Sequence, residues 1–381
     1  MISQRRSMVI ENASIVTPEK VVENGSIKIV DGVIADISTG RLNGCSEKLD
    51  VDGMYVMPGF VDLHGDAIER EIEPRAGALF PLNMAIVEMD RTLAASGITT
   101  MYHSLSYSRE NKMVRSNGLA SEIIREVNRL SPVLGVRTRV HARFEASCPD
   151  AVPYVERLLD DGRIHLLSIT CHYIGGEPAG NVNPQAPAML RSGDTGRLVD
   201  RCRRAGVLLA SHDDDTEEKL DVLKDLGIRY TEFPISADIA RSAAGRGMCI
   251  CLGAPNVVRG GSMFGDNLKA REAIRSGYGD ILCSDYAPMA IFHAIFTLEK
   301  LGILPLHQAV NMASLNPAKE VGIAGFTGAL KRGKCADMII VDPAGEVPRI
   351  LATFVEGREI YAGRQPAGNG GWRPKGEGGP Q

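Results

Sequence analysis

Short alternating runs of apolar and polar residues fill the first part of the chain. Between about residues 7 and 56, the segments SMVIENASIV, SIKIVDG and VIADIS each alternate in this way, as strands with one buried face do. Asn24-Gly25 and Asp31-Gly32 supply turn signals between them, because Asn, Asp and Gly tolerate the backbone conformations of tight turns. We therefore expect a small antiparallel sheet in this region.

At Met57 the pattern changes to apolar segments separated by charged amphipathic stretches. Eight such segments follow one another: GFVDLHGD, ITTMYHSLS, VRTRVHARFE, HLLSITCH, VLLASH, IRYTEF, MCICLGAP and DILCSDY. Apolar strands that alternate with helical stretches are typical of parallel sheets. Eight in succession predict an α/β fold, namely a (β/α)8 TIM-like barrel.

Short β-like segments return after the predicted barrel. LPLHQAVNMASLNPAKEVG indicates a helix followed by a turn, and ADMIIVD and RILATFVEGREIYAG then have strand-like patterns. We expect these strands to join the N-terminal ones in a small accessory β-sheet or sandwich domain. The expected division is 1–56 and 328–365 for the two parts of this accessory domain, 57–327 for the barrel, and 366–381 for a flexible tail rich in Gly and Pro.

Composition and charge narrow the class of protein. Apolar residues make up 44% and charged residues 24% of the 381 positions, which is typical of globular chains and disfavours a disordered or collagen-like one. The net charge of −4 is too close to neutral to indicate a nucleic-acid or membrane partner. The sequence shows neither a membrane-spanning apolar run nor a signal-peptide pattern, so we expect a cytoplasmic protein. The eight cysteines are scattered and form no CxxC pair, which argues against a disulfide framework or a thiolate zinc site.

Polar side chains stand where the predicted barrel strands end. The strands of a parallel barrel are normally apolar, and their carboxyl ends meet at one mouth of the barrel. Any single histidine there could be an ordinary hydrogen-bonded residue, but several candidates coincide. They are His64, Asp66, Glu145, His172, His212 and Asp285. Because imidazole and carboxylate ligands suit zinc, manganese or iron, we predict a site for one or two divalent transition metal ions.

Longer motifs give a family resemblance over nearly the whole chain. MPGFVDLHGD, the histidine-ended strands, the late SDY aspartate, and SLNPAKEVG before GALKRGKCADMIIVD resemble the amidohydrolase superfamily. More narrowly, HGDAIEREIEPRAG, HARFE, ASHDD, TEFP and GAPNVVRGGS resemble the PhnM-type diphosphatases of the carbon–phosphorus lyase pathway. Those enzymes hydrolyse alpha-D-ribose 1-methylphosphonate 5-triphosphate to the 5-phosphate and pyrophosphate. The form His64-x-Asp66, where the superfamily usually has HxH, is itself a mark of this branch.

The resemblance implies a role for each strand-end residue. It makes five of them metal ligands: His64, Asp66, His172, His212 and Asp285. Glu145 becomes the bridging carboxylate, and Asp285 also accepts a proton from the attacking water. Zinc is the metal expected first, with manganese or iron as alternatives. One segment, HYIGGEP, departs from the sequence expected of the branch, and this departure bears on the choice of substrate.

A triphosphate substrate requires cations near the metal site, and arginine binds phosphate through two parallel hydrogen bonds. Arg143 shares a strand face with Glu145, and Arg259 precedes Gly260, Gly261 and Ser262, so we predict these two arginines as the main phosphate contacts. The complete set of predicted substrate-binding residues is Arg70, Arg75, Arg143, Arg259, Ser262, His103 and His141.

Several members of this set have other interpretations. Arg70 lies between Glu69 and Glu71, where it could equally be a solvated surface residue. His103 could cap the end of its strand, and His141 could orient Glu145 rather than contact a substrate.

Three functions are compatible with these residues. The first is a metal-dependent hydrolase that releases pyrophosphate from the ribosyl methylphosphonate triphosphate, a small phosphorylated sugar. The second is an amidohydrolase acting on a carbon–nitrogen bond, such as a deaminase or cyclic amidase, to which the altered HYIGGEP segment would be adapted. The third is a non-enzymatic member of the fold that binds a partner. The sequence leaves open which metal is bound and whether the chain forms a homo-oligomer.

Overall fold

The computed structural model describes residues 7–43, 45, 47–108, 113–174, 177–178, 182–263, 265 and 267–363. The predicted flexible tail and part of the HYIGGEP segment lie outside these residues. The chain divides into two compact units. The first comprises Met1–Val61, Arg91–Thr100 and Ile295–Gln381, and the second comprises Asp62–Asp90 and Met101–Ala294. The domain boundaries expected from the sequence stay a prediction.

The first unit contains a sheet built from strands near both ends of the chain. Across the sheet the order is β18 (Arg358–Ala362), β17 (Arg349–Val355), β16 (Met338–Asp342), β5 (Tyr55–Pro58), β1 (Ser7–Val16), β2 (Val21–Val30) and β3 (Val33–Thr39), and β4 (Glu47–Asp50) pairs with β1. The expected antiparallel pairing holds for β1 with β2 and for β2 with β3. However, β4 and β5 run parallel to β1. The sheet is therefore mixed, because the chain crosses over through β2 and β3 before it returns to β1.

The apolar positions of the alternating pattern form the core of this sheet. Ile10, Ile27, Ile340 and Phe354 are at most 4% exposed and belong to one buried cluster. Lys28, next to Ile27 in β2, is only partly buried, as alternation predicts. Two helices, α12 (Leu306–Ala313) and α13 (Leu315–Glu320), belong to the same unit.

The second sheet is the predicted barrel. Its strands follow chain order: β6 (Phe60–Gly65), β7 (Ile98–Tyr107), β8 (Arg137–Glu145), β9 (Leu166–Thr170), β12 (Leu208–His212), β13 (Tyr230–Glu232), β14 (Cys249–Gly253) and β15 (Ile281–Cys283). Each of the eight predicted apolar segments contains one of these strands, and the pairings from β8 to β15 are parallel. The (β/α)8 prediction is therefore confirmed, with Glu145 at the end of the third strand and His212 at the end of the fifth.

The last strand of the barrel, β15, meets the first strand, β6, near the carboxyl ends of both. Gly65 and Asp285 form a parallel bridge. The N–H of Asp66 donates to the Asp285 carbonyl, and the N–H of Asp285 donates to the His64 carbonyl, both at 2.9 Å. The barrel is thus closed by the residues that the sequence predicts as metal ligands.

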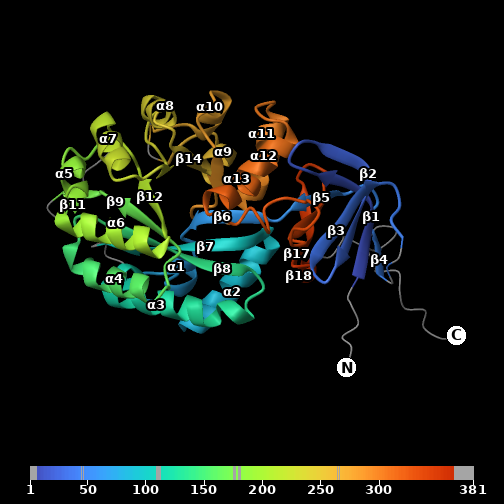
Figure 1. Ribbon diagram of the computed structural model, residues 1–381, viewed down its shortest axis with the longest axis horizontal. Helices are drawn as coiled ribbons and strands as arrows, with labels where there is room; N and C mark the ends of the chain where they lie inside the picture. Colours follow the sequence, from blue (N-terminus) through green and yellow to red (C-terminus); the bar gives the residue numbers. More distant parts are fainter. Residues whose placement is uncertain are drawn as a thin grey trace. The chain divides into compact units, whose positions relative to one another are not determined.

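Helices lie on the outside of these strands, as Figure 1 shows for those around β8, β9 and β12. The α-helices that follow β6 along the chain as far as Lys300 are α1 (Ala67–Ile72), α2 (Leu82–Ala95), α3 (Asn117–Leu130), α4 (Val152–Asp160), α5 (Ala186–Leu190), α6 (Gly193–Ala205), α7 (Glu217–Asp225), α8 (Ala237–Gly245), α9 (Ala254–Arg259), α10 (Ala270–Arg275) and α11 (Ala290–Lys300). A short hairpin of β10 (Tyr173–Ile174) and β11 (Glu177–Pro178) follows His172.

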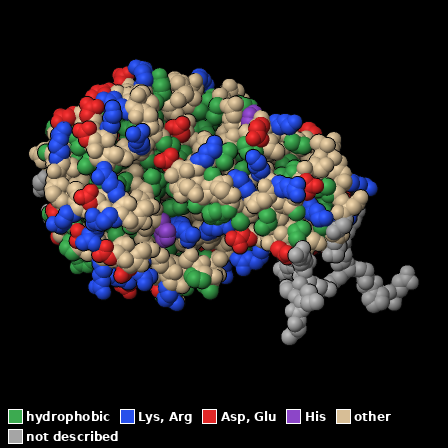
Figure 2. Space-filling view, viewed as in Figure 1, with side chains coloured by type: hydrophobic (Ala, Val, Ile, Leu, Met, Phe, Trp, Pro, Cys, Tyr) green, Lys and Arg blue, Asp and Glu red, His purple; other side chains and the backbone are tan. Residues whose placement is uncertain are grey.

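None of the helices in the described part of the chain is long and apolar enough to span a bilayer. Figure 2 shows Lys and Arg interspersed with Asp and Glu on the face drawn.

Two glycines, Gly97 in the first unit and Gly277 in the second, allow a direct test of how tightly the first unit is packed around Gly97. Gly97 and Gly277 share the same left-handed backbone, with φ of +79°. A Cβ on Gly97 would lie 3.0 Å from Ile350 and 3.1 Å from Phe60, whereas a Cβ on Gly277 would meet nothing within 4 Å. The two positions therefore differ in crowding and not in backbone strain.

We predict that Gly97→Ala lowers the free energy of unfolding by ~1–3 kcal/mol more than Gly277→Ala, because only the first change overpacks a core. Both variants share the strain of placing alanine in the left-handed region. Urea unfolding of the two variants measures the difference. Equal losses would show that crowding around Gly97 is relieved without cost.

Candidate active site

Left-handed residues follow three of the barrel strands. Asp213, Phe233 and Asp285 have φ values of 48°, 57° and 54°. Their N–H groups nevertheless donate to the carbonyl oxygens of neighbouring strands, at 2.8, 3.0 and 2.9 Å. Non-glycine residues in this conformation are uncommon and cluster at functional sites. Here they end the strands on the side where the polar residues gather.

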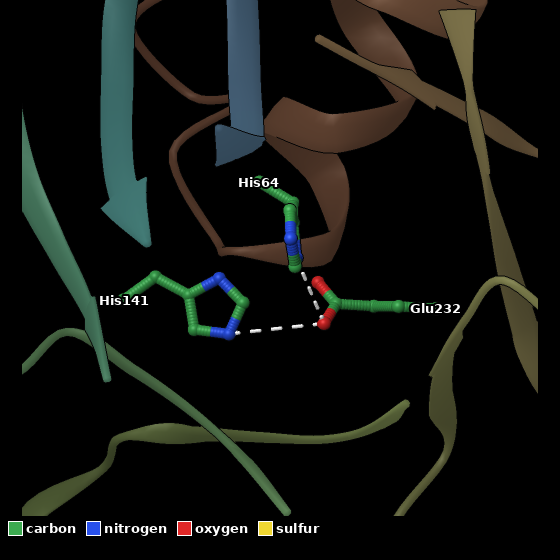
Figure 3. Close-up of side chains that lie close together, drawn as sticks. All are labelled: His64, His141 and Glu232. Carbon is green, nitrogen blue, oxygen red and sulfur yellow. Dashed lines mark ion pairs between the residues drawn. The ribbon is translucent and has the colours of Figure 1, made fainter. Parts of the chain in front are cut away.

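Two histidines and a carboxylate converge inside the barrel. His64 of β6, His141 of β8 and Glu232 of β13 point toward one another in Figure 3. The Glu232 carboxylate lies 3.1 Å from His64 Nδ1 and 3.8 Å from His141 Nε2, and all three side chains are at most 1% exposed. Burial raises the pKa of Glu232 to about 7 and lowers the pKa of His64 to about 3. The imidazole of His64 is therefore neutral, which is the form that binds metals.

His141 is held by hydrogen bonds from three further strands. Its Nδ1 lies 3.0 Å from both the Ser104 hydroxyl and the Leu63 carbonyl, and its Nε2 lies 2.9 Å from the Ser168 hydroxyl. Since a carbonyl only accepts, Nδ1 carries the proton and Nε2 faces Ser168 and Glu232 with its lone pair.

A second group of side chains surrounds His212. Asp213 Oδ2 lies 3.0 Å from His212 Nδ1 and 3.0 Å from His172 Nε2. Glu145 accepts a hydrogen bond of 2.9 Å from the His172 N–H and lies 3.4 Å from His172 Nδ1. Burial lowers the pKa of His212 to about 3. Burial also tends to lower the pKa of His172, but its bonds to Asp213 and Glu145 outweigh that effect and raise it.

The two groups adjoin each other. The ring centroids of His64 and His212 are 5.2 Å apart, and those of His172 and His212 are 5.3 Å apart. Phe233 packs edge-on against both His64 and His212, with centroids 5.1 and 5.0 Å away. Four of the predicted residues, His64, Glu145, His172 and His212, therefore form one connected cluster.

Asp66 lies between two arginines. Its Oδ2 is 3.5 Å from Arg115 and 3.7 Å from Arg143. Arg115 also pairs with Glu69 at 2.8 Å, while Arg143 Nη2 lies 3.2 Å from His212 Nε2. The guanidinium of Arg143 is thus close to two of the predicted metal ligands.

Asp285 follows β15 at the point where this last strand of the barrel meets the first strand, β6. Burial, and then the negative charge of Asp66, raise the pKa of Asp285 to about 7. Nearby, Asp62 accepts backbone hydrogen bonds from His64 and Ser284, at 3.3 and 3.1 Å. These bonds tie the strand that carries His64 to the segment that carries Asp285.

A cavity of about 750 Å³ opens over this cluster. It is large enough for a phosphorylated sugar, since small-molecule pockets usually measure ~300–1,000 Å³. The predicted site residues that line it are Asp66, Arg70, Arg75, Arg143, His172, His212, Arg259, Ser262 and Asp285. His64 and Glu145 are buried beside it, whereas His103 and His141 are at most 2% exposed and do not line it.

Sequence reasoning missed three site residues. Asp213 immediately follows His212, and Glu232 ends the sixth strand as the other candidates end theirs, so the same strand-end rule could have found both. That strand has only three residues, which weakens the pattern. Arg115 lies in the short helix Met113–Arg115 and carries no strand-end signal.

The residues present fit a divalent metal ion. Two groups of side chains each bring three ligand atoms within 4.8 Å of one another: His64, His141 and Glu232, and His172, His212 and Asp213. Among the described residues, no hydrogen bond of regular geometry satisfies the buried Nδ1 atoms of His64 and His212 or either oxygen of Glu232, although each imidazole nitrogen lies within 3.1 Å of a carboxylate. Neutral imidazoles beside unsatisfied carboxylate oxygens are the donors that such a cation requires.

We predict that protein purified without chelator holds about one to two equivalents of a divalent transition metal. His64→Ala should lose most of it, because the change removes a buried imidazole from the cluster. His307→Ala, on α12 in the other unit, is the matched control and should retain the metal. Elemental analysis decides the matter. A metal content below ~0.2 equivalents, with activity that survives chelation, would contradict the prediction.

Comparison with known proteins finds relatives over part or nearly all of the chain. Residues 194–363 match the amidohydrolase family. The alpha-D-ribose 1-methylphosphonate 5-triphosphate diphosphatase of Escherichia coli (strain K12) is 27% identical over 388 residues, which cover 93% of this chain and 100% of that protein. A 5-methylthioadenosine/S-adenosylhomocysteine deaminase of Bacillus cereus (strain AH820) is 23% identical over 420 residues, covering 92% of this chain and 89% of that protein.

Solved structures share the fold at low sequence identity. Ochratoxinase of A. niger matches with a TM-score of 0.70 at 14% identity, covering 94% of this chain and 96% of that one. The L-hydantoinase of Arthrobacter aurescens matches with a TM-score of 0.66 at 16% identity, covering 93% and 96%. These structures show the fold of the chain, and residues 194–363 in addition match the amidohydrolase family.

Proposed function

We propose that this protein is a metal-dependent hydrolase that releases pyrophosphate from alpha-D-ribose 1-methylphosphonate 5-triphosphate in phosphonate catabolism. The observation that carries the proposal is the set of five arginines that line the cavity over the histidine and carboxylate cluster. The relative from Escherichia coli, which aligns along its whole length, supports the same substrate. The cytoplasmic location and the oligomeric state expected from the sequence stay predictions.

The charges that line the cavity suit a polyphosphate once a cation is present. Five arginines and five carboxylates line it, so their formal charges cancel. A single divalent ion among the carboxylates would leave the lining positive. That excess would be available to a triphosphate, which carries several negative charges.

The residues proposed to hold the metal are those implied by the family resemblance: His64, Asp66, Glu145, His172, His212 and Asp285. We propose one or two zinc ions, with manganese or iron as alternatives that the same donor types accept. When bound, such an ion lowers the pKa of water and stabilises negative charge on phosphate oxygens. Asp213 and Glu232 lie within the same clusters and would orient or supplement these ligands.

The chain's own side chains would then position the substrate and move one proton. Arg143 reaches the cavity beside Asp66 and His212, where it would hold phosphate oxygens near the reacting bond. Arg259 lines the same cavity beside Ser262 and would bind another phosphate. Water adds to phosphorus, the anhydride bond to the departing pyrophosphate breaks, and an Asp285 carboxylate oxygen accepts the proton of the water.

A carbon–nitrogen hydrolase is the second candidate. It is favoured by the deaminase from Bacillus cereus, which aligns with 92% of this chain. The two functions yield different products. Incubation with the ribosyl methylphosphonate triphosphate should release pyrophosphate, which phosphorus NMR detects, with nucleoside triphosphates as controls. Release of ammonia from an amine or amide substrate, without pyrophosphate from the triphosphate, would favour the second candidate.

We predict that Arg143→Ala and Arg259→Ala each lower kcat/KM for the triphosphate by ~10- to 100-fold, the value of one charged hydrogen bond to phosphate. Lysine at either position should recover only part of the loss, because it lacks the bidentate guanidinium. Arg129→Ala is the control: Arg129 is exposed and pairs with Glu126 of the same helix. Effects under ~3-fold at both sites would contradict the assignment of these arginines to phosphate.

We also predict that Asp285→Asn abolishes turnover while removing less metal than His64→Ala does. An amide keeps an oxygen that can bind a cation but cannot take up the proton of the water. Steady-state kinetics and elemental analysis of both variants test this. A fully active Asn variant would exclude Asp285 from proton transfer, and a folded but metal-free variant would restrict Asp285 to metal binding.

A further inference from the structure

A buried lysine lies beneath the strand end that carries His212 and Asp213. Lys219 belongs to α7, yet its side chain is only 2% exposed. Its Nζ donates to the His212 carbonyl at 2.9 Å and to the Asp213 carbonyl at 3.0 Å. The ammonium also forms an ion pair of 3.0 Å with the Asp214 carboxylate. The three protons of the ammonium thus face three oxygens of one turn.

The start of α7 brings the lysine into this place. Thr216 caps the helix by accepting a hydrogen bond from the Lys219 N–H. Lys219 therefore lies in the first turn, directly after the turn that leaves β12. The ammonium then joins this first turn of the helix to the end of β12.

Asp214 fixes the other side of the same turn. One of its carboxylate oxygens accepts hydrogen bonds from Ser211 of β12 and Thr231 of β13. Its carbonyl accepts a bond from the Ile235 N–H at 3.0 Å. The Lys219–Asp214 pair is thus anchored to two adjacent barrel strands.

The turn held by these contacts contains one residue, Asp213, that has an unfavourable backbone conformation and whose side chain contacts two predicted metal ligands. Asp213 is left-handed, with φ of 48°. Its carboxylate reaches both His212 Nδ1 and His172 Nε2 at 3.0 Å. If its backbone relaxed to an ordinary conformation, the carboxylate would leave one or both histidines, and their rings would lose the partner that sets their orientation.

We propose that Lys219 is a positioning residue of the candidate metal centre: its ammonium holds the carbonyl oxygens of His212 and Asp213 so that the Asp213 carboxylate orients His172 and His212. This proposal rests on the metal centre of the proposed function. It assigns a task to a residue that touches neither the cavity nor the predicted ligand atoms.

The experiment compares Lys219→Met with Lys224→Met. Lys224 is exposed on the same helix, so the control has the same chemical change without the buried contacts. Lys219→Met alone leaves Asp214 buried without its cation, which could prevent folding. The double variant Lys219→Met with Asp214→Asn removes both charges and keeps the amide within reach of Ser211 and Thr231. For each protein, Co²⁺ is titrated into the metal-free form, and its visible absorption and affinity are recorded together with the melting temperature.

We expect both Lys219 variants, where folded, to bind Co²⁺ ~10- to 100-fold more weakly than the control. Their absorption spectra should also change, because the ligand geometry relaxes. Co²⁺ binding with unchanged affinity and spectrum, alongside a lowered melting temperature, would overturn the proposal, since Lys219 would then serve only stability. A double variant that does not fold would also overturn it. Wild-type protein that binds no Co²⁺ would instead remove the metal centre itself.

Discussion

Carboxylates buried at the carboxyl ends of the barrel strands impose the main electrostatic constraint on this molecule. Burial is the largest of the causes that raise the pKa values of Glu232, Asp62 and Asp285 to about 7. An ionised carboxylate removed from water costs several kcal/mol unless a cation or hydrogen bonds compensate it. The neighbouring histidines cannot supply that charge, because burial keeps His64 and His212 neutral. A divalent ion would satisfy both groups at once, and it would also offset the carboxylates whose formal charges otherwise balance those of the arginines in the cavity.

The fold could be predicted from the sequence because it depends on short-range patterns. Eight apolar segments separated by amphipathic stretches admit few arrangements other than a parallel barrel, and all eight contain a strand. The same rule brings the strand-end residues together, since parallel strands place their carboxyl ends at one mouth. His64, His172, His212 and Asp285 meet for this reason, although their loops differ. Parallel pairing of β4 and β5 with β1 could not be predicted, because alternation indicates which face is buried and not the direction of the neighbouring strand.

Contacts that depend on tertiary structure could not be read from the sequence. Lys219 lies in the charged run TEEK at the start of a helix, where a lysine is usually solvated, yet it is buried. Arg115 pairs with Glu69, 46 positions earlier in the chain, and no spacing rule connects them. His141 was expected near the substrate or Glu145, but its hydrogen bonds run to Ser104, Leu63 and Ser168 inside the barrel. These residues support the site through packing of several strands, which local patterns do not encode.

The position of a cation tests the central claim most directly. Crystals of the protein grown with its metal should give anomalous scattering, recorded at the absorption edge of that metal, from a point among the side chains of His64, Glu145, His172, His212 and Asp285. A peak there would establish that the buried carboxylates and neutral histidines are built around a cation. Fully ordered side chains at this place with no anomalous peak, in crystals of protein that turns over its substrate, would contradict the account.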